Sequence, residues 1–296
     1  MRILLLIVLS TSFLRAQKSI QDIKQKAIDY YQCEKFDSAL IYFNKVIELN
    51  PFDSISYIDR ALTKEMLNNY CGAVADYSRL ARIDSNGVDA YFLRGIALYK
   101  MGIFDAALFD FQKSIILEND NAYAYYFVGK IYQYDGKIKT SKKYFEKALM
   151  HNDEHSESLY ELADFQFKRR NYDTALVLVR KSISAFRNID ALKLYCLISF
   201  MKSDFSEAVS SFREIIKTNP SEIYSLINSF RKLKKKPKIT KKNKVETDYY
   251  YNIILSILFS DYKSSLKSLY ELKQQNSLDD ETLFLEVLIN SFSIIN

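Results

Sequence analysis

The sequence contains no Trp, two His, three Pro and six Gly among its 296 residues. So few turn-forming residues exclude a sandwich or barrel with many tight turns and favour long helices. Cys33, Cys71 and Cys196 are odd in number and share no tight spacing, which excludes a disulfide framework and a Cys-based zinc site. We expect these thiols to be buried rather than catalytic. Hydrophobic residues make up 48% of the chain and charged residues 26%, as in an ordinary globular protein.

The first sixteen residues have the pattern of a secretory signal peptide. A basic start at Arg2 precedes the apolar run 3–9, and Ala16 offers a cleavage site before Gln17. The run is shorter than the about 20 residues that span a bilayer. Cleavage predicts an exported protein, periplasmic or associated with the cell envelope. An uncleaved anchor or an ordinary N-terminal helix remain alternatives, and the chain is cytoplasmic if the leader is not cleaved.

A period of 34 residues organises positions 20–222. The same residue types recur through six copies, with a spacing of 33 at the last step. One set of small residues is Ala39, Ala73, Ala107, Ser141, Ala175 and Ala208. Bulky residues follow four positions later at Phe43, Tyr77, Phe111, Phe145, Val179 and Phe212. Other small residues lie twelve positions earlier at Ala27, Ala61, Gly95, Gly129, Ala163 and Cys196. This agreement establishes an internal repeat.

Each copy is predicted to be a pair of helices. Apolar residues fall at the helical spacing on both sides of a short turn, and Gly102 and Gly136 suit the left-handed conformation that ends a first helix. A small residue such as Gly95 lets two helices approach closely while a neighbouring ring fills the space. Pro51 and Pro220 end the second helices of their copies.

These features resemble the tetratricopeptide repeat family, through the small pair Gly95 and Ala107, the flanking rings of Tyr91 and Phe104, and a closing Pro51. The resemblance implies an all-α, right-handed superhelical solenoid of antiparallel helix pairs with a concave face that binds peptides or proteins. The expected divisions are a signal peptide at 1–16, repeats at 20–53, 54–87, 88–121, 122–155, 156–188 and 189–222 within 17–222, a helix and Lys-rich linker at 223–245, and a degenerate seventh repeat plus a capping helix at 246–296.

The concave face is expected to bind a protein segment through aromatic side chains of the first helices. Tyr offers contact area at low entropic cost and keeps a hydroxyl for backbone groups. The alternative is that these rings pack between neighbouring repeats. The candidate partner-binding residues are Phe92, Tyr99, Tyr123, Tyr126, Tyr134, Tyr160 and Phe167.

Some family members bind a C-terminal carboxylate through basic and Asn side chains on the first repeats. Lys24 stands at one such position, but Ile28 and Asp59 stand at others, and Asp59 would repel a carboxylate. We therefore do not expect this activity. Ile28, Leu62 and Ile96 indicate an apolar partner segment instead.

Residues 231–244 carry nine positive charges and no acid, so the net charge of +6 falls to −3 without them. A solvated linker is one interpretation. An alternative is an adaptor that binds anionic lipid or polysaccharide through Lys234, Lys235, Lys236, Lys238, Lys241, Lys242 and Lys244. Nucleic acid is not the expected partner, because no aromatic residue in this run could stack on bases.

Residues 151–155 match the H-x-x-E-H pattern of some zinc peptidases. The repeat register places them at a surface turn between two copies, where the two His would not share one helix face. The sequence also has no glycine-rich phosphate loop and no G-x-S-x-G elbow. We therefore expect no enzyme, no cofactor and no metal.

Overall fold

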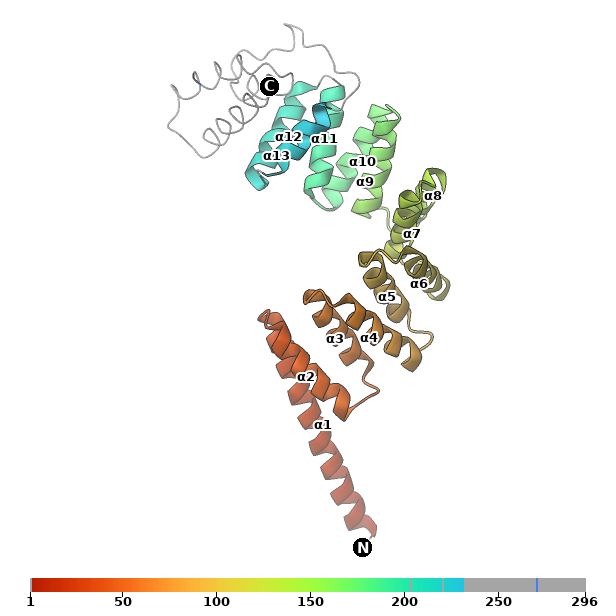
Figure 1. The fold of residues 1–296 in the computed structure, drawn as a ribbon, viewed down its shortest axis with the longest axis vertical. Coiled ribbons are helices and arrows are strands. Elements are labelled where there is room, and N and C mark those ends of the chain that lie inside the picture. Colours follow the sequence, from red (N-terminus) through yellow and green to blue (C-terminus); the bar gives the residue numbers. More distant parts are fainter. Residues whose placement is uncertain (1, 203, 220, 232–269, 271–296) are drawn as a thin grey trace. The chain divides into compact units, whose positions relative to one another are not determined.

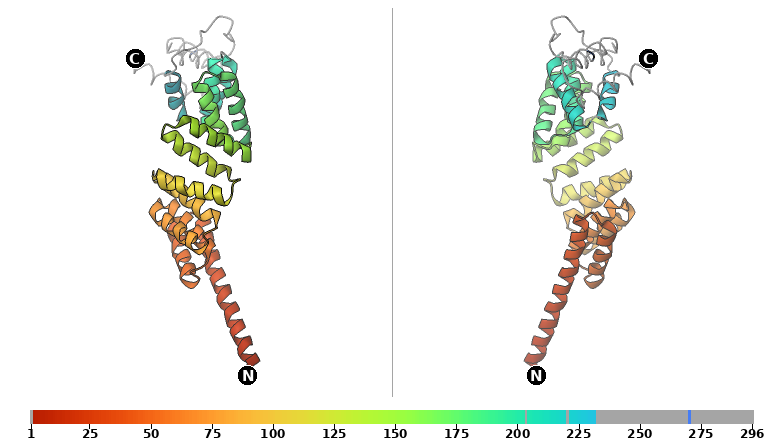
Figure 2. Two further views of the ribbon diagram at one scale, coloured as in Figure 1. Left: turned by 90° about the vertical axis from the view of Figure 1, so that its right-hand side faces the viewer. Right: turned by 90° about the vertical axis from the view of Figure 1, so that its left-hand side faces the viewer.

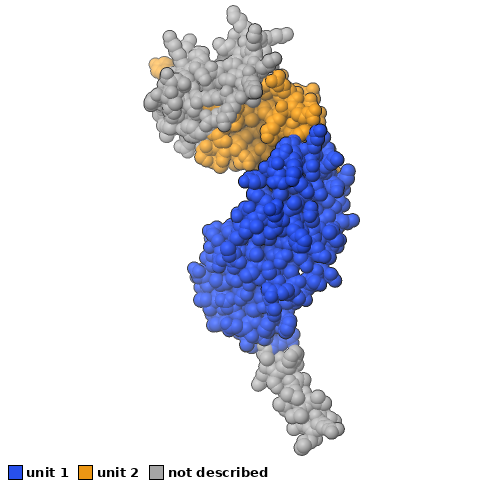
Figure 3. All heavy atoms as spheres, turned by 45° about the vertical axis from the view of Figure 1, so that its right-hand side comes forward, with its two compact units in different colours: residues 1–151 blue, residues 152–296 orange. Residues whose placement is uncertain are grey.

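The computed structural model describes residues 2–202, 204–219, 221–231 and 270, and this part of the chain contains helices joined by short turns and no strand (Figure 1). It divides into two compact units, residues 1–151 and 152–296, which are described separately (Figure 3). The all-α fold predicted from the sequence is confirmed.

Unit 1 consists of four consecutive helix pairs. Its helices are α1 (Arg2–Gln32), α2 (Phe36–Leu49), α3 (Ser54–Met66), α4 (Tyr70–Ile83), α5 (Val88–Lys100), α6 (Phe104–Leu117), α7 (Ala122–Tyr134) and α8 (Ile138–His151). Each helix packs against the one that follows it, and the directions of consecutive helices alternate (Figure 2). The C-terminal part of α1 packs against α2, where Ala27 lies with Ala39 and Phe43 in one buried cluster.

Unit 2 continues the same arrangement. Its described helices are α9 (Ser156–Lys168), α10 (Tyr172–Ala185), α11 (Ile189–Met201), α12 (Phe205–Thr218) and α13 (Glu222–Arg231). Ala163, Ala175 and Val179 are fully buried in its core cluster. The predicted seventh repeat and capping helix within 246–296 and the closing Pro220 lie outside the described residues.

The turn inside each pair has a left-handed residue at the same repeat position. Gly102 and Gly136 have φ of 76° and 72°, which confirms their predicted role. The equivalent residues in three other copies are Glu34, Asn68 and Arg170, with φ of 57°, 58° and 65°. The N–H of Ile103, one residue beyond Gly102, donates to the Leu98 carbonyl at 2.9 Å. This hydrogen bond is typical of a Schellman helix end.

The close approach of paired helices depends on the predicted small residues. A Cβ added at Gly95 would lie 2.9 Å from the Phe111 ring, and one added at Gly129 would lie 2.6 Å from the Phe145 ring. Both rings are buried. The prediction that a ring fills the space beside a small residue is therefore confirmed at these two positions.

A pair of buried ion pairs repeats at the same spacing. Arg94 donates to both carboxylate oxygens of Asp110 at 2.7 Å and to Ser78 Oγ of the preceding pair at 3.1 Å. The equivalent Arg60, 34 residues earlier, donates to Asp76 at 2.6 and 3.0 Å and also to Asn44. The first helix of a pair is thus bonded to its own second helix and to that of the preceding pair.

Candidate functional site

The first helices of the pairs hold the residues predicted to bind a partner. Five of the seven predicted residues belong to α5 and α7 in unit 1, and Tyr160 and Phe167 belong to α9 in unit 2. Whether they bind a partner remains a prediction, but their surroundings differ in an informative way.

Phe127 joins three of the predicted residues, although sequence analysis did not select it. Its ring centroid lies 6.4 Å from that of Phe92, 5.3 Å from that of Tyr99 and 5.4 Å from that of Tyr126. Phe127 also stacks on Phe111 at 5.0 Å with an interplanar angle of 5°. Such ring pairs contribute about 0.5–1.5 kcal/mol each beyond area burial. The inner parts of Phe92, Tyr99 and Tyr126 therefore stabilise the unit as well as offering surface.

Tyr123 and Tyr134 are the two most accessible of the predicted residues. The exposed fraction is 49% for Tyr123 and 75% for Tyr134. One edge of Tyr134 contacts Phe104, with ring centroids 4.5 Å apart. Both belong to α7, and their separation of eleven residues corresponds to about three helical turns, so they share one face of that helix.

The two predicted residues of unit 2 are packed against its core. Tyr160 and Phe167 are half-buried beside the cluster that contains Ala163 and Ile198, and Phe167 contacts Tyr172 with ring centroids 5.8 Å apart. Burial, followed by the negative charge of Asp164, raises the pKa of the Tyr160 hydroxyl. Tyr160 is therefore a neutral hydrogen-bonding group over the physiological pH range.

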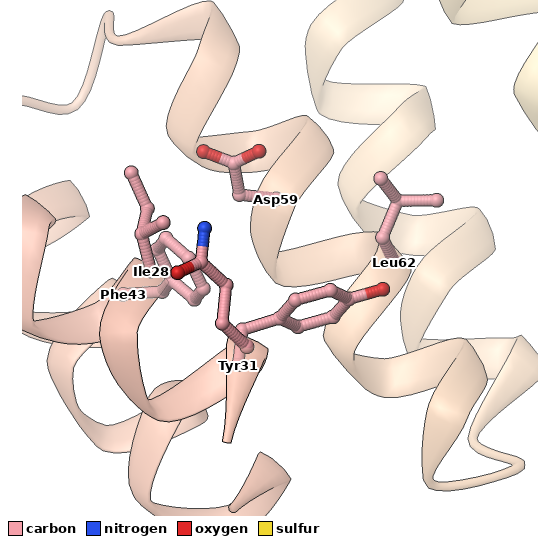
Figure 4. A pocket seen from close by; sticks show the side chains of 6 residues that line it. Ile28, Tyr31, Phe43, Asp59 and Leu62 are labelled. Atoms are coloured by element: carbon pink, nitrogen blue, oxygen red, sulfur yellow. The ribbon is translucent and has the colours of Figure 1, made fainter. Parts of the chain in front are cut away.

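A second feature of the first helices is a pocket that we call the α1–α3 pocket. It has a volume of about 280 Å³ and is lined by Ile28, Tyr31, Gln32, Phe43, Asp59 and Leu62. The Tyr31 ring and the Asp59 carboxylate extend into the space between α1 and α3, with Ile28 and Phe43 on one side and Leu62 on the other (Figure 4). The walls are mostly apolar, and the pocket includes the apolar positions 28 and 62 that the sequence singled out.

The charges around this pocket are distributed unequally. Lys24 donates to Asp53 at 3.1 Å, while Asp53 also caps α3 and accepts a 2.7 Å hydrogen bond from Ser56 Oγ. Burial raises the pKa of Asp53, but the hydrogen bonds from Ser56 and Lys24 outweigh this effect and lower it. Lys24 is thus already paired, which agrees with the expectation that no carboxylate clamp exists here.

Asp59 is different from Asp53. In the part of the chain that the structure describes, its carboxylate makes no hydrogen bond or ion pair. Burial, which is the largest effect, raises the pKa of Asp59, and the attraction of Lys24 offsets this only in part. The site therefore holds a half-buried carboxylate without a direct cationic partner.

The expected burial of the thiols is correct for one Cys and wrong for two. Cys196 is buried and donates to the Ala208 carbonyl at 3.2 Å, and burial raises the pKa of its thiol. Cys33 and Cys71 are exposed, because they lie at the turn after α1 and in the first turn of α4. Exposure alone assigns them no chemistry.

The two His of the H-x-x-E-H pattern have separate structural roles. His151 is the last residue of α8 and stacks on Tyr125 with ring centroids 5.0 Å apart. His155 caps α9, accepting a hydrogen bond from the Ser158 N–H at 3.2 Å. Its placement as a surface residue is wrong, since only 2% of it is exposed. Burial lowers the His155 pKa, despite the opposing charge of Glu157. Among the described residues no group of His, Cys, Asp or Glu could hold a metal ion.

Two further predictions concern the ends of the chain. The lysines predicted to contact an anionic surface, from Lys234 to Lys244, lie outside the described residues. Residues 2–16 continue into α1, and no helix in the described ranges has both the length and the apolar character needed to cross a membrane. The prediction that 1–16 is a cleaved leader remains a prediction.

The fold and these surfaces define an all-helical repeat scaffold. The tetratricopeptide repeat model matches residues 26–53 and 122–153. Together with the helix pairs described above and the relatives that follow, this match shows that the chain is a tetratricopeptide repeat protein.

Curated relatives match through part of their length. Human serine/threonine-protein phosphatase 5 is 28% identical over 151 residues, which cover 51% of this chain and 29% of the phosphatase. A TPR repeat-containing protein of Methanocaldococcus jannaschii is 26% identical over 211 residues, covering 68% of this chain and 37% of the relative. The chain thus spans about a third of the length of these relatives.

Solved structures agree in fold. PilF of Pseudomonas aeruginosa has a TM-score of 0.63 and 19% identity, covering 73% of this chain and 98% of PilF. PilW, a type IV pilus biogenesis factor, has a TM-score of 0.57 and 15% identity, covering 68% of this chain and 94% of PilW. Tetratricopeptide repeat scaffolds generally mediate interactions between proteins.

Proposed function

We propose that this chain is a non-catalytic scaffold that binds an extended or helical protein segment on the face formed by the first helices of its repeats. The repeat family supports protein binding in general terms. The residues proposed to contact the segment are the aromatic side chains of α5, α7 and α9. The scaffold is proposed to act outside the cytoplasm if residues 1–16 are removed.

The observation that carries this proposal is the exposure of Tyr123 and Tyr134 along one face of α7. Their Cα atoms are about 16 Å apart along the helix, a length that a peptide of several residues can follow. Between them, Tyr126 and Phe127 are half-buried and held by ring contacts. Rigid rings of this kind lose little conformational entropy on binding, which favours them as contact residues.

Site-specific crosslinking in the native cells tests the proposal. The photoreactive residue p-benzoylphenylalanine replaces Tyr123 or Tyr134 in the full chain, and crosslinked proteins are identified by mass spectrometry. The same substitution at Ile116 and Met150, which are 76% and 80% exposed on the second helices α6 and α8, is the matched control. We expect protein crosslinks from α7 and few from the control positions.

A double substitution, Tyr123→Ser with Tyr134→Ser, should weaken capture of the crosslinked partner by at least about tenfold, because aromatic contacts dominate protein interfaces. Helix content measured by circular dichroism should be unchanged, since both side chains are exposed. Equal crosslinking at all four positions, or full capture by the double variant, would contradict the proposal.

An envelope adaptor that binds anionic lipid or polysaccharide through residues 231–244 is the alternative proposal. Its support is the concentration of nine positive charges in fourteen residues. Such a contact would weaken with rising salt, unlike one formed by aromatic rings.

A further inference from the structure

The α1–α3 pocket combines apolar walls with one carboxylate. Ile28 and Leu62 supply aliphatic surface and Phe43 a ring, whereas Asp59 supplies a negative charge that no described residue pairs directly. Side chains that suit such a site are themselves divided, with an apolar stem and a cationic end. Lys and Arg are the protein side chains with this division.

The local charges reinforce this preference. Lys24 is the nearby cation, and its ammonium group is held by Asp53 at 3.1 Å. Lys24, Asp53 and Asp59 together carry a net charge of −1 when ionised. A ligand carboxylate would be repelled, and an uncharged apolar side chain would cover Asp59 without giving it a partner, which is costly in a partly desolvated site.

We propose that the α1–α3 pocket binds a Lys or Arg side chain from a partner protein segment, with its stem between Ile28 and Leu62 and its cation on Asp59. This inference rests on the proposed function, because it specifies the chemistry of the segment at one point. A guanidinium donates to a carboxylate through charge-assisted hydrogen bonds. The Tyr31 ring, which extends into the pocket (Figure 4), adds a surface on which a cation is attracted.

The test compares two peptides that differ in one charge. The probes are a fluorescein-labelled, end-blocked peptide Ala-Leu-Ala-Arg-Ala-Leu-Ala and the same peptide with citrulline in place of Arg, which has nearly the same shape but no charge. Binding to the full chain is followed by fluorescence anisotropy. The Arg peptide should bind at least about tenfold more tightly, because a charge-assisted contact replaces a neutral one.

Asp59→Asn should reduce the preference for the Arg peptide to near onefold. Asp22→Asn is the matched control, because Asp22 is an exposed carboxylate on α1 outside the pocket lining, and it should retain the preference. Leu62→Ala should weaken both peptides together. Asp59→Asn should fold at least as well as the parent chain, since burial disfavours the ionised Asp59 carboxylate.

Three results would overturn the inference: equal binding of the two peptides, no binding of either at millimolar concentration, or an Arg preference that survives Asp59→Asn. None of these results would contradict the proposed scaffold function, because that function is tested at Tyr123 and Tyr134 with the native partner. Conversely, an Arg preference lost in Asp59→Asn would support the pocket even if α7 gave no crosslinks.

Discussion

At the scale of single residues, the left-handed turn position shows how one backbone demand is met by different side chains. Gly102 and Gly136 adopt positive φ without a Cβ penalty, and Asn68 tolerates this conformation better than most residues. Glu34 and Arg170 adopt it at a cost of about 1–2 kcal/mol each. The hydrogen bonds of the turn hold both of them there, as in the bond from the N–H of Asn171 to the Gln166 carbonyl at 2.9 Å.

Arg170→Gly should therefore stabilise unit 2. The strain of the left-handed Arg is removed, while the greater freedom of Gly in the unfolded chain returns part of the gain, leaving a net increase of roughly 0.5–1 kcal/mol in the free energy of unfolding. Urea unfolding followed by circular dichroism measures the change. Asn68→Gly is the matched control and should give a smaller gain. A lower urea midpoint for Arg170→Gly would show that the backbone strain is not the controlling factor.

At the scale of helices, the Arg–Asp ion pairs bond three consecutive helices at one level. Arg94 in α5 pairs with Asp110 in α6 and bonds Ser78 in α4. The Asp110 side chain is 2% exposed and that of Arg94 is 20% exposed. Hydrogen bonding to Asp110 raises the pKa of Arg94 against the opposing effect of burial, so the guanidinium stays charged. Both charges are satisfied only while both are present.

Asp110→Ala should destabilise unit 1 by about 3 kcal/mol, because it leaves the Arg94 guanidinium largely buried without its carboxylate. The double variant Arg94→Leu with Asp110→Leu places at this level the residue types found 68 positions later, Leu162 and Leu178. We expect it to recover most of the lost stability, since apolar pairs often replace buried ion pairs at little cost. Thermal unfolding of the three proteins measures the coupling. Additive losses in the double variant would contradict this account.

At the scale of the whole molecule, the start of the chain decides where the scaffold meets its partner. The basic residue Arg2, the apolar run 3–9 and Ala16 form the pattern of a secretory leader. In the structure, α1 extends from Arg2 to Gln32, and its contacts with α2 are made by residues after position 16, such as Ala27, Ile28 and Tyr30. Removal of residues 1–16 would leave those packing residues in place.

N-terminal mass spectrometry of the protein from its native cells should identify Gln17 as the first residue. The mature chain should then fractionate with the cell envelope or periplasm. The Ala16→Lys variant, which disrupts the small residue before the cleavage site, should retain the leader. A native chain that begins at Met1 or Arg2 would contradict export and would favour a scaffold kept in the cytoplasm.

The sequence alone determined the repeat, the helix pairs, the turn positions and the small residues beside rings, because each depends on local spacing that recurs every 34 residues. It could also have indicated the Arg60–Asp76 and Arg94–Asp110 pairs, since they follow the same spacing. Only the tertiary structure decided that Phe127 joins three predicted residues, that His155 is buried, and that Lys24 pairs with Asp53 and leaves Asp59 without a direct partner. These outcomes depend on which side chains of neighbouring helices meet, and helix packing determines this rather than the period of the sequence.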